Sequence, residues 1–288
     1  MLSGSKYLCI LALIIVLASC PNDTEPSESR DKLKLSGKVY TREIGAFSLS
    51  SVFSGTIVVY AATNGDIAIS DEGMGGAGHI KKGQLNYSIG KPAALMPLNP
   101  DDLELSAIEG IYSDVTLSSD GSNAAFLYLT PLDTDYDLLI REFCEISPPD
   151  TRAFPLVPIT LQYGIVNYVY VDRNLTVSAQ GSLSSYPLAD LPINDFLQGI
   201  PFNLADNDAV LKANDIKLGL KKGWNAVHSA LTLTITASLP LESLNPETFD
   251  IEDIEIDTIA GEIKVSIGNP ESHKFTLDNT SSASEVYP

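Results

Sequence analysis

Closely spaced carboxylates are the first candidates for chemistry in this chain. Asp133, Asp135 and Asp137 have the spacing of the first three ligands of an EF-hand loop. That loop needs glycine at its sixth position and glutamate at its twelfth, where the chain has Leu138 and Cys144. An EF-hand is therefore excluded, and a looser Ca²⁺ site competes with solvated turns, which aspartate favours. The same two readings apply to the aspartates of ADNDAVLKAND, which are Asp206, Asp208 and Asp215.

A second acidic run, FDIEDIEIDTIAGEIK, offers paired carboxylates of the kind that glycosidases use as acid and base. Ile254 and Ile256 alternate with Glu255 and Asp257, which predicts that the acids lie on the solvent face of a strand. Charge on that face also discourages edge pairing. The remaining acids of the run are Asp250, Glu252 and Asp253.

The histidines and the cysteine of the body do not form a recognisable constellation. His79, His228 and His273 are scattered, without the spacing of a zinc site. Cys144, between apolar neighbours in REFCEIS, is expected to be a small buried strand residue. We assign no catalytic residue, cofactor or metal from the sequence, and a carboxylate-dependent hydrolase is kept as the second alternative function.

The segment DEGMGGAG matches the G-x-G-x-x-G spacing of dinucleotide-binding loops. Such a loop works by opening a helix whose N-terminus holds the pyrophosphate. Here the next residues, HIKKGQLNYSIG, alternate like a strand and contain a turn signal. We therefore expect an inter-strand loop and no nucleotide.

Aromatic residues supply one further binding hypothesis. Trp224 is the only tryptophan and follows a Lys-Lys-Gly turn, while Tyr168 and Tyr170 share one face of a predicted strand. Exposed, these rings would stack on sugar faces, which gives the first alternative function: a glycan-binding protein for polysaccharide capture. The competing expectation is that Trp224 packs over its own core, because tryptophan is usually well buried.

The first 20 residues have the order of a secretory signal. Lys6 is followed by an apolar run, Tyr7 to Leu17, that is too short to span a bilayer, and then by small residues. Leu17-Ala18-Ser19-Cys20 resembles the lipobox of bacterial lipoproteins of the spirochaete type. The resemblance implies cleavage after Ser19 and acylation of Cys20, so residues 1–19 are the expected signal peptide and the lipid bilayer the expected partner. Several acyl chains on one residue make a stable anchor.

Residues 20–33, rich in Pro, Ser and charge, are expected to form a flexible tether. Pro21 stands where enteric lipoproteins retained at the inner membrane carry Asp, so we expect the outer membrane, at its periplasmic face or at the cell surface. The formal net charge of −19 makes nucleic acid an unsuitable partner and predicts repulsion from anionic headgroups. Once Cys9 leaves with the signal peptide and Cys20 is acylated, Cys144 has no disulfide partner.

Period-two alternation dominates the rest of the chain and predicts an all-β protein. In SALTLTITASLPL, Leu231, Leu233 and Ile235 are expected on one face and the threonines between them on the other. Apolar residues do not recur with a helical period over the length of a stable helix, and NDAVLKAND and INDFLQG are expected to allow at most a turn or two. These features predict two β-sandwich domains with Ig-like or transthyretin-like architecture.

A proline-rich segment, ISPPDTRAFPLVP, suggests a domain boundary, because Pro148, Pro149, Pro155 and Pro158 do not suit a central strand. The expected domains are 34–147 and 159–278, followed by a polar tail, 279–288. The strands of LSGKVY, GTIVVYAATNGD and GQLNYSIGKP resemble transthyretin-like and carboxypeptidase-regulatory-like modules. That resemblance implies a non-catalytic module. The expected function is thus a membrane-anchored lipoprotein that presents such modules for a binding or structural role, with a glycan or protein ligand.

Overall fold

The protein is an all-β, sandwich-type structure. The computed structural model describes residues 30–44, 58–103, 105, 108, 110–132, 134, 136–147, 150, 156–188, 191, 207–238, 255–268 and 274–279. Within these ranges there is no α-helix, and the 3-10 turn η2 (Pro100–Asp102) is the only helical element with assigned bounds. The predicted fold class is therefore confirmed.

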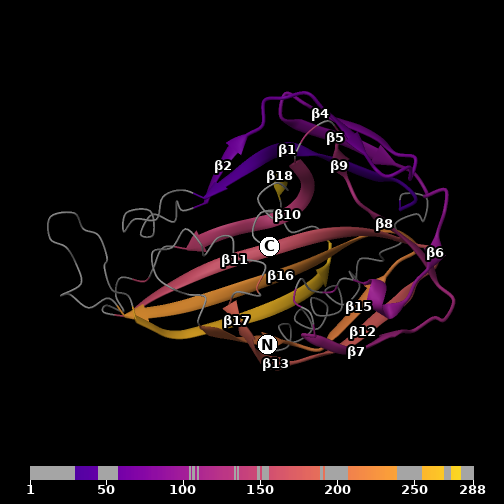
Figure 1. Ribbon diagram of the computed structural model, residues 1–288. Helices are drawn as coiled ribbons and strands as arrows, with labels where there is room; N and C mark the ends of the chain where they lie inside the picture. Colours follow the sequence, from indigo (N-terminus) through magenta and orange to yellow (C-terminus); the bar gives the residue numbers. More distant parts are fainter. Residues whose placement is uncertain are drawn as a thin grey trace, which may run out of the picture.

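Two sheets are formed by the described strands (Figure 1). The strands of the large sheet are β1 (Leu33–Ile44), β2 (Val58–Ala62), β3 (Ile67–Ser70), β4 (Ala77–Lys81), β5 (Gln84–Ile89), β6 (Met96–Pro97), β8 (Asn123–Leu127), β9 (Thr130–Pro131), β10 (Tyr136–Ser147), β11 (Leu156–Val171), β13 (Leu183–Pro187), β14 (Asp208–Ala213), β16 (Gly223–Ser238), β17 (Glu255–Ile267) and β18 (Lys274–Asn279). The small sheet contains β7 (Tyr112–Leu117), β12 (Leu175–Gly181) and β15 (Ile216–Leu220). The large sheet runs β13-β14-β17-β16-β11-β10-β18-β1-β5-β4-β3-β9, with β2 on β1 and β8 on β11, and the small one runs β15-β12-β7.

The antiparallel pair of β11 and β16 forms the centre of the large sheet. These strands pair antiparallel along their whole length, from Leu156 opposite Ser238 to Val171 opposite Gly223. In β16 the apolar residues that alternate from Leu231 to Ala237 are at most 5% exposed, whereas the threonines between them are only partly buried. The alternation predicted from the sequence is thus confirmed, because successive side chains of a strand point to opposite faces.

At the end of β11 and β16 that contains Tyr170 and Trp224, both faces of the sheet are covered. On one face, Tyr170 and Trp224 pack with residues of β1, β5 and β18. On the other, Val169 and Val227 pack against the small sheet through Val177 and Leu218, among others. In Figure 1, β1, β4 and β5 lie above the long strands and β7, β12 and β15 lie below them. This three-layer end explains why NYVYVD is apolar on successive residues rather than strictly alternating.

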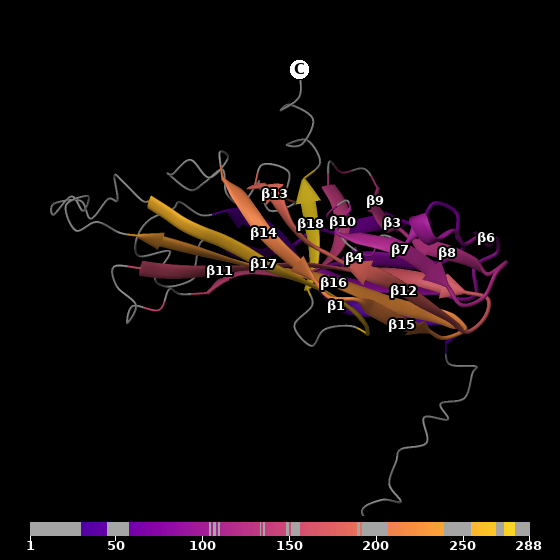
Figure 2. The same ribbon diagram turned by 90° about the horizontal axis from the view of Figure 1, so that it is seen from below.

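At the other end, β11, β16 and β17 extend beyond the small sheet (Figure 2). There a third core cluster joins Leu161, Leu233 and Ile263 to Leu211 of β14. The segment NDAVLKAND forms strand β14 rather than a helical turn, with Ala209, Leu211 and Ala213 buried. Its period of two and its parallel pairing with β17 explain this correction. INDFLQG lies outside the described residues.

The proline-rich segment connects neighbouring strands of one sheet. β10 and β11, on its two sides, pair antiparallel, and β1 pairs parallel with β18. The core cluster around Tyr170 also draws on both halves of the chain, for example on Leu85 and Phe275. Pro158 lies within β11, opposite Thr236 of β16 and beyond the last pair that β11 forms with β10. The described strands of 34–147 and 159–278 therefore share a sheet and a core.

Candidate functional site

The Ca²⁺ candidates are not assembled into a site by the described residues. Asp133, Asp135 and Asp206 lie outside these residues, as does the side chain of Asp137, which belongs to β10. Asp208 begins β14, and Asp215 follows its end, where its carboxylate accepts a hydrogen bond from the N–H of Gly181 at 3.1 Å. The described part of the chain contains no group of three or more His, Cys, Asp or Glu side chains suited to a metal ion.

The other titratable candidates are equally dispersed. Asp257 is exposed and accepts a hydrogen bond from the hydroxyl of Ser238 at 2.7 Å, as expected for the solvent face of β17. His79 lies exposed on β4, and His228 lies partly buried on β16. Asp250, Glu252, Asp253, Ile254 and His273, together with the side chain of Glu255, are outside the described residues. Most of the acidic run therefore lies outside the described residues, and the hydrolase alternative stays a prediction.

The glycine-rich loop is a structural turn between β3 and β4. Asp71, which is 8% exposed, accepts hydrogen bonds from the N–H of Gly76 and from the hydroxyl of Tyr87, the latter at 2.9 Å. Burial, together with this hydrogen bond, raises the pKa of Tyr87 above its usual range. The loop is thus tied to β5 and is followed by a strand, so it lacks the helix that a phosphate site would need.

The aromatic residues considered for ligand stacking lie in the core. Trp224, Tyr168 and Tyr170 are 6%, 3% and 0% exposed. The rings of Trp224 and Tyr170 meet edge to face, with centroids 5.6 Å apart, and the Trp224 Nε1–H donates to the carbonyl of Gly90 at 3.0 Å. The stacking hypothesis is corrected accordingly: neighbouring residue types suggested a platform, but the strand pairing turns these rings inward.

The same tryptophan contacts Arg30, which lies shortly before β1. The N–H of Trp224 donates to the carbonyl of Arg30 at 2.9 Å, and the hydroxyl of Tyr170 donates to the carboxylate of Asp31 at 2.8 Å. Burial and this hydrogen bond raise the pKa of Tyr170 to about 12. We call Arg30, Asp31, Tyr170, Gly223 and Trp224 the tether-exit site. Sequence reasoning missed it, because its partners are far apart in the chain and Arg30 contributes only a carbonyl.

Gly223 is required by the geometry of this site. Its φ is +101°, a conformation that side chains with a Cβ rarely adopt. A Cβ placed there would approach the carbonyl oxygen of Arg30 to 2.6 Å and the Cβ of Arg30 to 2.7 Å. The close approach lets the first described residues lie directly on the start of β16.

We expect Gly223→Ala to lower the free energy of unfolding by about 2–4 kcal/mol, because it combines backbone strain with a clash against Arg30. Urea denaturation followed by circular dichroism measures the change. The matched control is Gly219→Ala in β15, where an added Cβ meets nothing within 4 Å and φ is not positive. A Gly223→Ala protein as stable as the control variant would contradict the assigned geometry.

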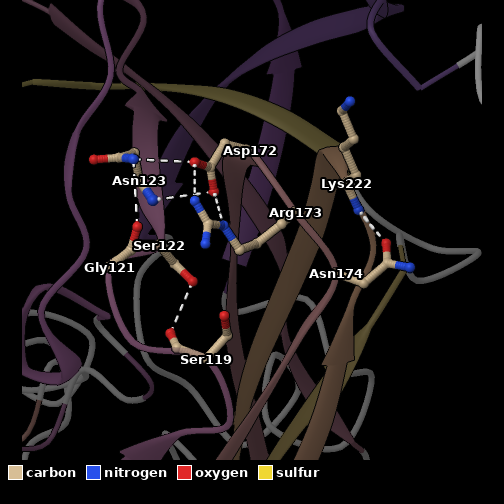
Figure 3. Close-up of polar contacts among 8 residues, drawn as sticks. All are labelled: Ser119, Gly121, Ser122, Asn123, Asp172, Arg173, Asn174 and Lys222. Carbon is tan, nitrogen blue, oxygen red and sulfur yellow. Dashed lines mark hydrogen bonds and ion pairs between the residues drawn. The ribbon is translucent and has the colours of Figure 1, made fainter.

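Two asparagines lock the Lys221-Lys222-Gly223 turn that leads into the tether-exit site. Asn225, which is 4% exposed, accepts from the N–H of Lys221 at 2.9 Å and donates to the carbonyls of Lys221 and Gly223. Asn174 accepts from the N–H of Lys222 at 2.7 Å (Figure 3). Because all these contacts use backbone atoms of the lysines, the turn is held firmly while both lysine side chains are exposed.

Asp172, at the end of β11, ties the adjoining turns together (Figure 3). It accepts from the N–H and the side-chain amide of Asn123 at 3.1 and 3.0 Å, and from Arg173 at 3.0 and 3.1 Å. The hydrogen bond from Arg173, helped by those from Asn123, lowers the pKa of Asp172 to about 2, although burial acts against this. The carboxylate therefore stabilises the fold in its charged form.

We expect Asp172→Asn to lower the free energy of unfolding at pH 7 by about 1–2 kcal/mol. Because the folded-state pKa lies below the unfolded one, the contribution of Asp172 is complete above about pH 4 and is lost as pH falls toward 2. Urea denaturation of both proteins between pH 7 and pH 2 measures this. A difference that stays constant over the whole range would contradict the role of the charge.

The tether-exit site fastens Arg30 and Asp31 to β16 and β11: the carbonyl of Arg30 accepts from the N–H of Trp224, and the carboxylate of Asp31 accepts from the hydroxyl of Tyr170. No helix among the described residues has the length and apolar character needed to cross a bilayer. Comparisons with protein-family models, with curated proteins and with solved structures found no match.

Proposed function

We propose that this protein is a bacterial lipoprotein, anchored to a membrane of the cell envelope through acylated Cys20, whose β-sandwich body has a non-catalytic binding or structural role. The observation that carries the proposal is the order of the first 20 residues: one basic residue, an apolar run, and Leu17-Ala18-Ser19-Cys20. Several acyl chains on Cys20 would supply a stable anchor without any membrane-spanning segment.

The tether-exit site supports this proposal. Arg30, whose carbonyl accepts a hydrogen bond from the N–H of Trp224, follows Cys20 by ten residues in the sequence. Ten residues span at most about 35 Å when fully extended. The body would then stay close to the bilayer while remaining outside it, which suits its acidic composition.

Mass spectrometry of the protein isolated from its own membranes tests the proposal. We expect the mature chain to begin at Cys20 and its N-terminal peptide to carry a diacylglyceryl thioether, with further mass if the new amino group is acylated. Labelled palmitate supplied to the growing cells is expected to enter the same peptide. A mature chain that begins elsewhere, or an unmodified Cys20, would refute the proposal.

A further inference from the structure

Basic residues gather around the tether-exit site, although the chain as a whole is acidic. Trp224 contacts Arg30 through its N–H and Gly90, the neighbour of Lys91, through its indole. We define the basic patch as the six cationic residues that surround these contacts and the start of β1: Arg30, Lys32, Lys34, Lys91, Lys221 and Lys222. All are exposed except Arg30, which is partly so.

The charge balance differs sharply between this end and the rest of the protein. Asp31 and Asp172 accept hydrogen bonds here, from Tyr170 and Arg173, and Asp120 is exposed in the adjoining turn. Counting also Asp23, Glu25 and Glu28, which shortly precede Arg30 in the sequence, gives six acids against seven cations, Arg173 included. The remainder of the chain holds 31 of the 37 acids and 11 of the 18 cations. The excess of acids, which predicts repulsion from anionic surfaces, therefore belongs to the rest of the chain and not to this end.

The opposite end of β16 carries an exposed acid, Asp257 of β17. Ser238 lies 14 residues from Trp224, about 45 Å along the strand, and pairs with Glu255 at the start of β17. Asp257 is exposed beside it. Along β16, the basic patch thus lies at the end near Trp224, and the exposed Asp257 lies at the other end.

Lys221 and Lys222 present exposed side chains from a turn whose backbone is held in place. Their backbone atoms are engaged by Asn225 and Asn174, and in Figure 3 the side chain of Lys222 extends away from its hydrogen-bonded neighbours. A short tether keeps this end at a high local concentration near the bilayer. Lysines in that position attract anionic headgroups over about a Debye length.

We propose that the basic patch docks on the anionic phospholipid headgroups of the membrane that carries the anchor, so that the end of β16 beside Asp257 points away from the bilayer. This inference rests on the proposed function, because it is the lipid on Cys20 that brings the patch to the membrane. The docking is electrostatic and reversible, and high salt weakens it.

Trp224, the sole tryptophan, lies at this end and supplies the measurement. The full-length, lipidated protein is inserted into phosphatidylcholine vesicles with or without one third phosphatidylglycerol, both containing a dansyl-labelled lipid. We expect energy transfer from Trp224 to dansyl to be at least twofold higher on the anionic vesicles in low salt, and equal on both in high salt. Equal transfer in low salt would overturn the inference.

Matched variants separate the patch from a general charge effect. Lys221→Glu with Lys222→Glu is expected to abolish the difference, since it keeps the backbone hydrogen bonds of the turn. The control is Lys81→Glu with Lys82→Glu, an exposed Lys-Lys-Gly turn at the other end of β5, about 20 Å away; it is expected to behave as the parent protein. The assignment of docking to the basic patch would be overturned if only the Lys81→Glu and Lys82→Glu variant lost the difference in energy transfer between the two vesicle types.

Flotation of the vesicles distinguishes the two proposals. Protein that floats with both vesicle types but shows equal energy transfer would retain the anchor and refute the docking. Protein that fails to float with either type would refute the anchor, and the docking with it.

Discussion

Replacing Cys20 by serine is expected to abolish incorporation of labelled palmitate and to move the protein from the membrane fraction to the soluble one. Each buried methylene of an acyl chain contributes about 0.8 kcal/mol, so the loss of two or three chains changes the partition by far more than tenfold. No described residue supplies a membrane-spanning helix to compensate. Labelling followed by detergent phase separation measures both effects.

Cys144→Ser is the matched control, because it removes the other cysteine that the mature chain would contain. Cys144 lies in β10, far along the chain from the lipobox, and its replacement is expected to leave both label and membrane fraction unchanged. Equal labelling of the Cys20→Ser variant and the parent would place the lipid elsewhere and refute the lipoprotein proposal.

Trp224→Ala is expected to lower the free energy of unfolding by about 3–5 kcal/mol, since it deletes a large buried side chain. The change removes the edge-to-face contact with Tyr170 and leaves the carbonyl of Gly90 without the indole N–H. Urea denaturation followed by circular dichroism measures the loss.

Two further variants serve for comparison: the first tests which part of the indole matters, and the second is an exposed control. Trp224→Phe keeps a ring in the core and loses the bond to Gly90, so we expect a loss of about 1–2 kcal/mol. Leu183→Ala, at a position that is 69% exposed, is expected to be nearly neutral. A Trp224→Ala protein as stable as the Leu183 variant would contradict the buried placement. If Trp224→Ala lost retention on a polysaccharide column while Trp224→Phe kept it, the loss would report unfolding. If both variants lost retention, the loss would point to a role of the indole in binding.

Strand content was predictable because side-chain alternation is a local property. In β16, the sequence ALTLTITA specifies which face each residue presents, and burial of Leu233 and Ile235 follows it residue by residue. The turns with Lys-Lys-Gly at 81–83 and 221–223 were equally readable, since glycine at positive φ marks them. The lipobox is a local pattern as well, and it stays a prediction.

Which strands pair with one another is not a local property, and the sequence did not predict it. The proline-rich segment suggested a boundary, yet β10 and β11 on its two sides pair with each other. Backbone hydrogen bonds are the same for any two strands, so composition does not say which strands become neighbours. Nor does it show that two layers cover NYVYVD, which decides whether its tyrosines stack on a ligand or fill a core.

The sequence by itself determined the all-β class and the faces of the long strands, and it predicts an acyl-cysteine at position 20. Only the tertiary structure decided that Trp224 is buried, that Arg30 is fastened to it, and that six cations of an acidic chain collect at that end. The physical reason is the range of the interactions. Alternation and turns act between near neighbours, whereas burial and charge clustering arise when distant segments are brought together, such as those of Arg30 and Trp224, about 190 residues apart.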